Sequence, residues 1–140
     1  MRSYAERQIF SERAMAMWCD AVDLIKRVSP TWNNELRCHE LARAAQTALN
    51  KLRFRSEPYE LRVVDGRLYS IDHSWLVYEV PRYRELYARR ILDVYCPGRL
   101  PQVQLIDGDH FAVTCGYEPG KTRTDIRLDV VKKLVREMST

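Results

Sequence analysis

The apolar residues of this chain change their spacing once, near Pro58, and this change limits the possible fold more than any other feature. Before it, apolar residues recur every three or four positions in two stretches, 3–28 and 35–52, which is helical spacing. After it, apolar and polar residues alternate, as in strands with one buried face. A last helical pattern begins at Thr124, its expected N-cap, and runs to about Glu137. We therefore expect an α+β domain with N-terminal helices packed on an antiparallel β-sheet and a C-terminal helix.

Turn residues divide the alternating region into strands. Asp65-Gly66 is the strongest hairpin signal in the chain and predicts a tight turn there. Asp107-Gly108-Asp109 predicts a second turn, and residues 116–122 are expected to form a loop. The strands expected between these turns are 59–64, a return strand that starts at 67–69 and continues or restarts at 73–80, 91–95, 102–106 and 110–114.

Size and charge exclude several classes of protein. The chain has 140 residues, enough for one domain (1–140), and a net charge of +4 that is spread along it. This dispersed charge does not favour a nucleic-acid partner. No apolar run approaches the roughly 20 residues of a membrane span, and the N-terminus lacks an apolar signal-peptide core. The sequence as written predicts a cytoplasmic protein without membrane contact, with export that needs no cleaved signal left open.

Four widely spaced cysteines are expected to be free thiols, because a chain of this size can build a core without disulfides. Cys19 lies within the first helical pattern and is expected to be a buried structural thiol. Cys38 falls in or near the first turn of the second helix, for which Asn33 or Asn34 is the expected N-cap. The positive end of a helix favours the thiolate form of a cysteine. Cys38 is therefore the candidate nucleophile.

A histidine begins the most apolar strand of the chain. An imidazole buried there without a partner is costly, so His73 needs one. Asp93, on the expected neighbouring strand, and Cys38 are the candidates. A thiol enzyme needs a thiolate, an imidazole that exchanges protons with it and a carboxylate that orients the imidazole, and these three residues supply those groups. Taken singly, each also has a structural interpretation as a core cysteine, a satisfied buried histidine and a strand-end carboxylate.

The sequence segments around His73 and Asp93 resemble those of a known family. Asp72-His73-Ser74-Trp75-Leu76-Val77-Tyr78-Glu79-Val80, followed by Arg90-Ile91-Leu92-Asp93-Val94-Tyr95, resembles the His and Asp strands of the transglutaminase-like branch of the papain-like cysteine enzymes. The order Cys, His, Asp also matches, and residues 33–95 are covered. The resemblance implies a papain-like, transglutaminase-like fold and a triad of Cys38, His73 and Asp93 acting on a protein or peptide substrate without metal or cofactor. It also implies oxyanion donors upstream of the nucleophile, at Asn33, Asn34 or Trp32.

By this resemblance, Cys38 attacks an amide or thioester carbonyl, His73 moves the proton and Asp93 orients His73. Peptide or isopeptide hydrolysis, glutamine deamidation and acyl transfer all use such a site, and the sequence does not separate them. His39 stands where the family commonly has an aromatic residue; because it points about 100° around the helix from Cys38, we expect it to be exposed.

Three alternatives stay open at this point. The chain could be a non-catalytic interaction module on the same fold or on an unrelated one. The base could instead be His110, with Asp107 or Asp109 beside it. A metal site could use three cysteines and one histidine, although no Cys-x-x-Cys or His-x-x-x-His spacing occurs; its ligands would be Cys38, Cys96 and Cys115 with His39, His73 or His110.

Overall fold

The computed structural model describes residues 4–28, 36–52, 60–79, 89–95, 104–107 and 116–139. Its elements in chain order are α1 (Tyr4–Val28), α2 (Cys38–Leu52), β1 (Glu60–Leu68), β2 (Ile71–Glu79), β3 (Arg89–Asp93), β4 (Gln104–Asp107), β5 (Tyr117–Pro119) and α4 (Leu128–Met138). The strands form one antiparallel sheet in the order β4-β3-β2-β1-β5.

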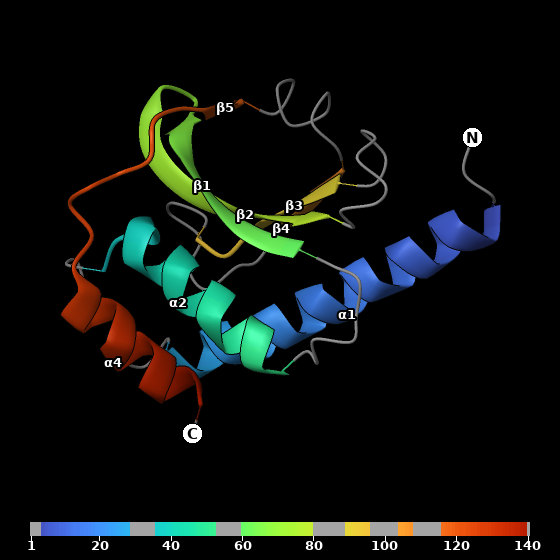
Figure 1. The fold of residues 1–140 in the computed structure, drawn as a ribbon, viewed down its shortest axis with the longest axis horizontal. Coiled ribbons are helices and arrows are strands. Elements are labelled where there is room, and N and C mark those ends of the chain that lie inside the picture. Colours follow the sequence, from blue (N-terminus) through green and yellow to red (C-terminus); the bar gives the residue numbers. More distant parts are fainter. Residues whose placement is uncertain are drawn as a thin grey trace.

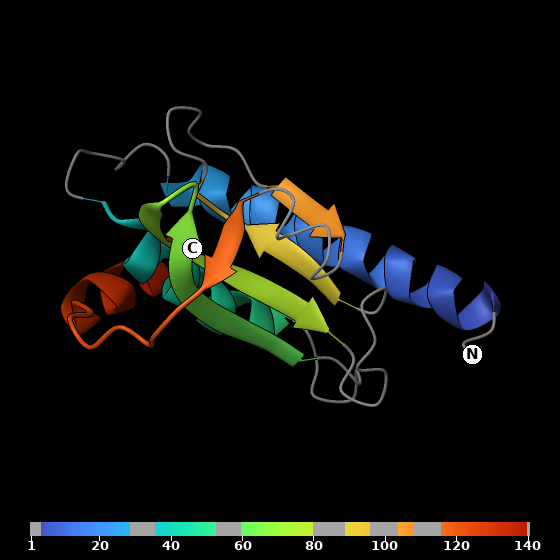
Figure 2. The same ribbon diagram turned by 90° about the horizontal axis from the view of Figure 1, so that it is seen from above.

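The three helices lie together on one side of the sheet, and the sheet curls away from them (Figure 1). Helix α2 is the centre of this layer, because it packs against β1 and β2 as well as against α1 and α4. The view from above shows β1 and β2 crossing the middle of the molecule, with the N-terminal end of α1 extending beyond the sheet (Figure 2). The expected α+β arrangement of helices packed on an antiparallel sheet, with a C-terminal helix, is confirmed.

Small side chains let α2 pack closely against its neighbours. Ala42, Ala44, Ala45 and Ala48 are all buried, and they add little bulk between α2 and the elements around it, which are β1, β2, α1 and α4. They belong to the main core, together with larger residues of α1, β2 and α4, among them Phe10, Met17, Leu24, Leu76, Tyr78 and Leu134. A second, smaller cluster covers the opposite face of the sheet and contains Trp75, Val77, Ile91 and Tyr117.

The predicted turn at Asp65-Gly66 is wrong. β1 runs unbroken from Glu60 to Leu68, and the hairpin loop is Tyr69-Ser70, since Leu68 pairs with Ile71. Both loop residues have positive φ, 48° and 67°, as a two-residue type I′ hairpin loop requires, although neither is the usual Asn or Gly.

Gly66 is a glycine for a different reason. A Cβ on Gly66 would lie 2.1 Å from the Glu118 carbonyl oxygen and 2.9 Å from the Trp75 ring, so any side chain there would push β5 away. The close approach arises only when β5 is in place in the sheet, whereas the turn prediction used only the adjacent residues Asp65 and Gly66.

Other boundaries also differ from the predictions. α4 begins at Leu128 instead of after Thr124, and its N-cap residue, Arg127, makes no side-chain cap hydrogen bond. β5 (117–119) lies within the expected loop, and β4 extends to Asp107, one residue beyond the expected strand. The rest of the predicted turn, Gly108-Asp109, lies outside the described residues. Cys19 is exposed, not buried, because it falls on the outer face of α1. The expected strand 110–114 lies outside the described residues.

Candidate functional site

The three predicted triad residues come from three different elements and are all buried. Cys38 lies in the first turn of α2, as expected, but it is the first residue of the helix, which therefore begins after Glu35 and does not have Asn33 or Asn34 as its N-cap. Cys38 is 7% exposed. His73, near the start of β2, is 2% exposed, and Asp93, the last residue of β3, is fully buried. The expected oxyanion donors Asn33 and Asn34, with Trp32, lie outside the described residues.

His73 and Asp93 form a direct hydrogen bond, 2.7 Å from His73 Nε2 to Asp93 Oδ2. They are diagonal neighbours and not directly opposed, because β2 and β3 pair Leu76 with Leu92 and the same register carried one step further sets Asp93 opposite Trp75. Among the described residues, β3 pairs with β2 only over 76–79. The edge of β2 beside His73 is therefore open to the start of α2.

Asp93 has two further donors besides His73. The Tyr117 hydroxyl donates to Asp93 Oδ2 at 2.6 Å, and the Tyr95 backbone N–H donates to Oδ1 at 3.1 Å. Because a buried carboxylate without hydrogen-bond partners is costly, these donors stabilise Asp93 in its place. The sequence analysis missed Tyr117, because it placed this tyrosine in a loop. The sequence around Tyr117 offers no more than an aromatic residue next to Gly116, and such a pair also occurs in turns, so it does not indicate a site residue.

Aromatic rings surround the His73 imidazole. Trp75 stacks on it with ring centroids 6.1 Å apart, and the rings of Tyr117 and Tyr95 lie 6.3 and 6.5 Å away. Trp75 and Tyr117 also contact each other edge-to-face, at 5.1 Å. These rings keep water from the His73–Asp93 bond and so strengthen it.

The electrostatics of His73 favour its charged form. Burial lowers the pKa of this imidazole, but hydrogen bonds with Asp93 and Cys38, together with their charges, raise the pKa to about 9. Since Nε2 is occupied by Asp93, Nδ1 is the ring nitrogen available to Cys38. His73 is thus bonded to Asp93, and Cys38 lies close enough to affect the pKa of His73.

His39 is buried, which contradicts the expectation of an exposed residue. It is 6% exposed, its Nδ1 lies 2.7 Å from Ser74 Oγ, and the same nitrogen is 3.5 Å from Cys38 Sγ. The expectation was wrong because His39, although it points to a different side of α2 from Cys38, faces Ser74 of β2. A second imidazole therefore touches the thiol.

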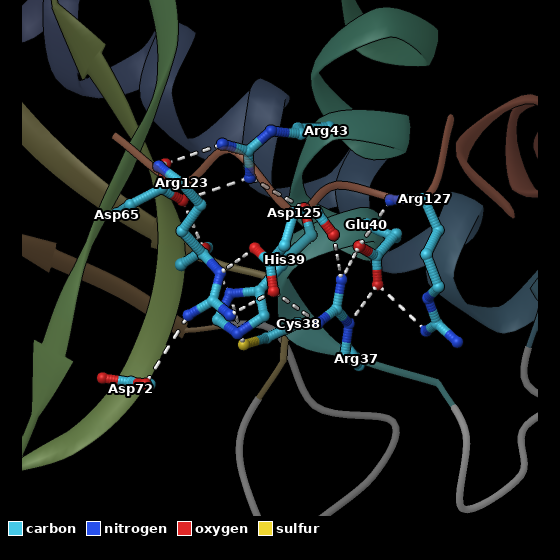
Figure 3. Close-up of polar contacts among 11 residues, drawn as sticks. Arg37, Cys38, His39, Glu40, Arg43, Asp65, Asp72, Arg123, Asp125 and Arg127 are labelled. Carbon is cyan, nitrogen blue, oxygen red and sulfur yellow. Dashed lines mark hydrogen bonds and ion pairs between the residues drawn. The ribbon is translucent and has the colours of Figure 1, made fainter. Parts of the chain in front are cut away.

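Ser74 links His39 to a buried carboxylate. Ser74 lies directly opposite Asp65 on β1, and its hydroxyl donates to Asp65 Oδ1 at 2.5 Å. Arg43, one turn after His39 on α2, donates to both Asp65 oxygens, at 3.1 and 2.6 Å, and the Arg123 backbone N–H donates to Oδ2 at 3.0 Å. Although burial alone raises the pKa of Asp65, these hydrogen bonds lower it. Figure 3 shows Arg43 and Arg123 on either side of this carboxylate.

A second buried carboxylate fixes the start of α2 to the segment before α4. Glu40 is fully buried and forms ion pairs with Arg37 and Arg127, whose backbone N–H also donates to it (Figure 3). Burial raises the pKa of Glu40, but these hydrogen bonds lower it to about 2. Arg37 also forms an ion pair with Asp125, at 3.1 Å. The segment 120–127 is in this way held across the first turn of α2, next to Cys38.

A polar hollow of about 460 Å³ opens beside this segment. Charges of both signs line it, and neither Cys38 nor His73 is among the lining residues; these are Asp65, Gly66, Arg67, Asp72, Glu118, Pro119, Gly120, Lys121 and Arg123. The hollow and the thiol share only the Asp65 network.

In the described ranges, no group of three or more His, Cys, Asp or Glu side chains is arranged to hold a metal ion. Cys96, Cys115 and His110, which the metal alternative and the alternative base require, lie outside those ranges. Of the helices that the structure describes, none has the length and apolar composition needed to cross a bilayer. Comparisons of the chain with protein-family models, with curated proteins and with solved structures give no match.

Proposed function

We propose that this chain is a thiol enzyme that performs acyl chemistry on an amide, with Cys38 as nucleophile, His73 as proton carrier and Asp93 as the group that orients His73. One observation carries the proposal. A buried imidazole bonds to a buried carboxylate, and the first cysteine of a helix lies close enough to raise the pKa of that imidazole. A purely structural histidine needs one partner, whereas this arrangement is that of an activated nucleophile.

The chemistry follows from the charge state of these groups. The Cys38 thiolate attacks the carbonyl carbon and forms a C–S bond, and the oxyanion accepts hydrogen bonds from first-turn backbone N–H groups of α2, which lack helical partners. The His73 imidazolium then gives its proton to the leaving amine, and the C–N bond breaks to leave a thioester. Water or a second amine attacks the thioester, His73 takes its proton, and Cys38 leaves as the thiolate.

Asn33 or Asn34 is proposed as a second oxyanion donor, and the fold as a papain-like fold of the transglutaminase-like branch. The substrate class proposed is a protein or peptide amide. Hydrolysis and glutamine deamidation both pass the acyl group to water and differ in the amide that Cys38 attacks, whereas acyl transfer passes it to an amine. All three are included in the proposal.

Alkylation tests the activated thiol, because the chain contains an internal control. Cys19 is exposed and Cys38 is buried, so accessibility alone predicts that iodoacetamide labels Cys19 first. The proposal predicts that Cys38 is labelled first at pH 7, as measured by peptide mass spectrometry, and that His73→Ala reverses the order. If Cys19 reacts faster in the wild-type protein, the thiol-enzyme proposal is wrong and the non-catalytic interaction module takes its place.

An acyl donor tests the covalent step itself. p-Nitrophenyl acetate should acetylate Cys38 in a burst of about one nitrophenolate per chain, followed by slower turnover. The burst should disappear in Cys38→Ala and His73→Ala and persist in Cys19→Ser. A burst of equal size in Cys38→Ala would place the reactive group elsewhere.

A further inference from the structure

His39 contacts the sulfur of Cys38, and the other hydrogen bond of its Nδ1 defines whether that nitrogen carries a proton. His73 is the proton carrier of the proposed function. His39 contacts the sulfur through Nδ1, at 3.5 Å, and the same Nδ1 lies 2.7 Å from Ser74 Oγ. An imidazole nitrogen is either a donor or an acceptor, so its partner decides between the two.

The Ser74 hydroxyl has one proton, and it donates this proton in a hydrogen bond to Asp65. Ser74 Oγ is 2.5 Å from Asp65 Oδ1, and the hydrogen bonds that Asp65 accepts from Arg43 and Arg123 keep it ionised and acceptor-only. Ser74 Oγ can therefore only accept from His39. Nδ1 must carry a proton, which excludes it as an acceptor for the Cys38 thiol proton.

The charges that face His39 come from three elements and keep it neutral. Glu40 belongs to the first turn of α2 and Arg37 immediately precedes that helix, while Asp65 belongs to β1 and Arg123 to the segment after β5. Burial, followed by the positive charges of Arg123 and Arg37, lowers the pKa of His39 more than the two carboxylates raise it. The two imidazoles at this sulfur are thus driven in opposite directions, one charged and one neutral.

We infer that His39 is a neutral hydrogen-bond donor to the Cys38 thiolate, its Nδ1 proton shared between the sulfur and Ser74, and that it does not serve as the base. The inference rests on the proposed thiol chemistry and adds a residue to it. Asp65 and Ser74 are positioning residues, because they act on the sulfur only through His39. When the sulfur becomes acylated and loses its charge, the Nδ1–H of His39 donates to Ser74 Oγ alone.

Nitrogen-15 NMR of the wild-type protein tests the tautomer directly. At pH 7, His39 should give one protonated and one unprotonated ring nitrogen, with the proton on Nδ1. A proton on Nε2 alone would overturn the inference, and so would an imidazolium. Ser74→Ala should remove the nearer of the two acceptors of the Nδ1 proton and allow the Nε2 tautomer to appear as well.

Two substitutions of similar polarity test the effect on the sulfur. The amide nitrogen of asparagine falls near the position of Nδ1, and that of glutamine near Nε2, so His39→Asn keeps a donor beside the sulfur and His39→Gln moves it away. The rate of Cys38 alkylation is measured from pH 5 to 9 after circular dichroism has established that both variants fold. His39→Asn should stay within about twofold of wild type, while His39→Gln should react about tenfold more slowly at pH 7, with its midpoint about one pH unit higher.

The outcomes separate the two proposals. If wild-type Cys38 is not labelled ahead of Cys19, the thiol chemistry fails and the role of His39 fails with it. If Cys38 is preferred but both variants retain the wild-type profile, the thiol chemistry stands and the donor role of His39 is wrong. If neither variant folds, the tautomer measured in the wild-type protein decides.

Discussion

Removal of the His73 imidazole should change how stability depends on pH, since His73 binds its proton more tightly in the folded chain. Its pKa is raised from 6.5 to about 9. Below pH 6.5 the imidazole is protonated in both states and the stabilisation is complete; as pH rises toward 9 the unfolded chain has lost the proton and the folded chain then loses it too. A shift of this size corresponds to about 3 kcal/mol lost across the window, a large share of the 5–15 kcal/mol typical of a domain.

Urea unfolding at pH 6, 7, 8 and 9, followed by tryptophan fluorescence, measures this loss. His73→Gln should be less stable than wild type at pH 6 and should lack the decline. His39→Gln is the matched control: the pKa of His39 is lowered, so its contribution disappears as pH falls below 6.5 and not as it rises. Because cysteine titrates near this window, the comparison is repeated in Cys38→Ala, where Asp93 alone should give a smaller decline of the same sign. Parallel wild-type and His73→Gln curves would refute the reasoning.

Three further substitutions test the surroundings of the site by urea unfolding. Tyr117→Phe removes one donor from the buried carboxylate that holds His73 and should cost about 1.5–3 kcal/mol, whereas Tyr69→Phe, at an exposed ring, should change stability by less than about 0.5 kcal/mol. Gly66→Ala should cost about 1–3 kcal/mol by pushing β5 away, and Gly120→Ala, where a Cβ has ordinary room, should cost less; equal losses would contradict the close-approach argument. Glu40→Gln leaves two arginines without their shared charge and should cost about 3–5 kcal/mol at pH 7, with the wild-type advantage falling as pH drops from 4.5 toward 2.

The residues that the sequence located correctly are those whose position depends on a repeating pattern. Helical spacing placed Cys38 in the first turn of α2, and strand alternation placed His73 and Asp93 on neighbouring strands. Proximity then followed from an antiparallel connection of ordinary length. The helix-on-sheet architecture was predictable for the same reason.

The features that were missed depend on contacts between distant segments. The hairpin turns at Tyr69-Ser70 because β5 needs Gly66 inside the strand, and residue-by-residue turn preferences contain no information about β5. Tyr117 joins the site through the same strand, only three residues long and therefore too short for an alternation pattern. At both the hairpin loop and Tyr117, the pairing of the edge strand β5 with β1 outweighs the local turn and loop preferences of the sequence.

The neighbouring histidines show why residue type alone could not assign the chemistry. In sequence, His39 is the imidazole nearest Cys38 and has the same donor and acceptor groups as His73. The difference between them lies in what they bond. Asp93 accepts directly from His73 and stabilises its charge, whereas Asp65 is hydrogen-bonded to His39 only through the Ser74 hydroxyl, so that its charge acts on His39 from farther away. A direct carboxylate contact thus distinguishes the proposed proton carrier from the neutral donor, on which burial and the charges of Arg123 and Arg37 prevail. Ser74→Asp, which would bring a carboxylate into direct contact with His39, should raise the pKa of His39 and reduce that distinction.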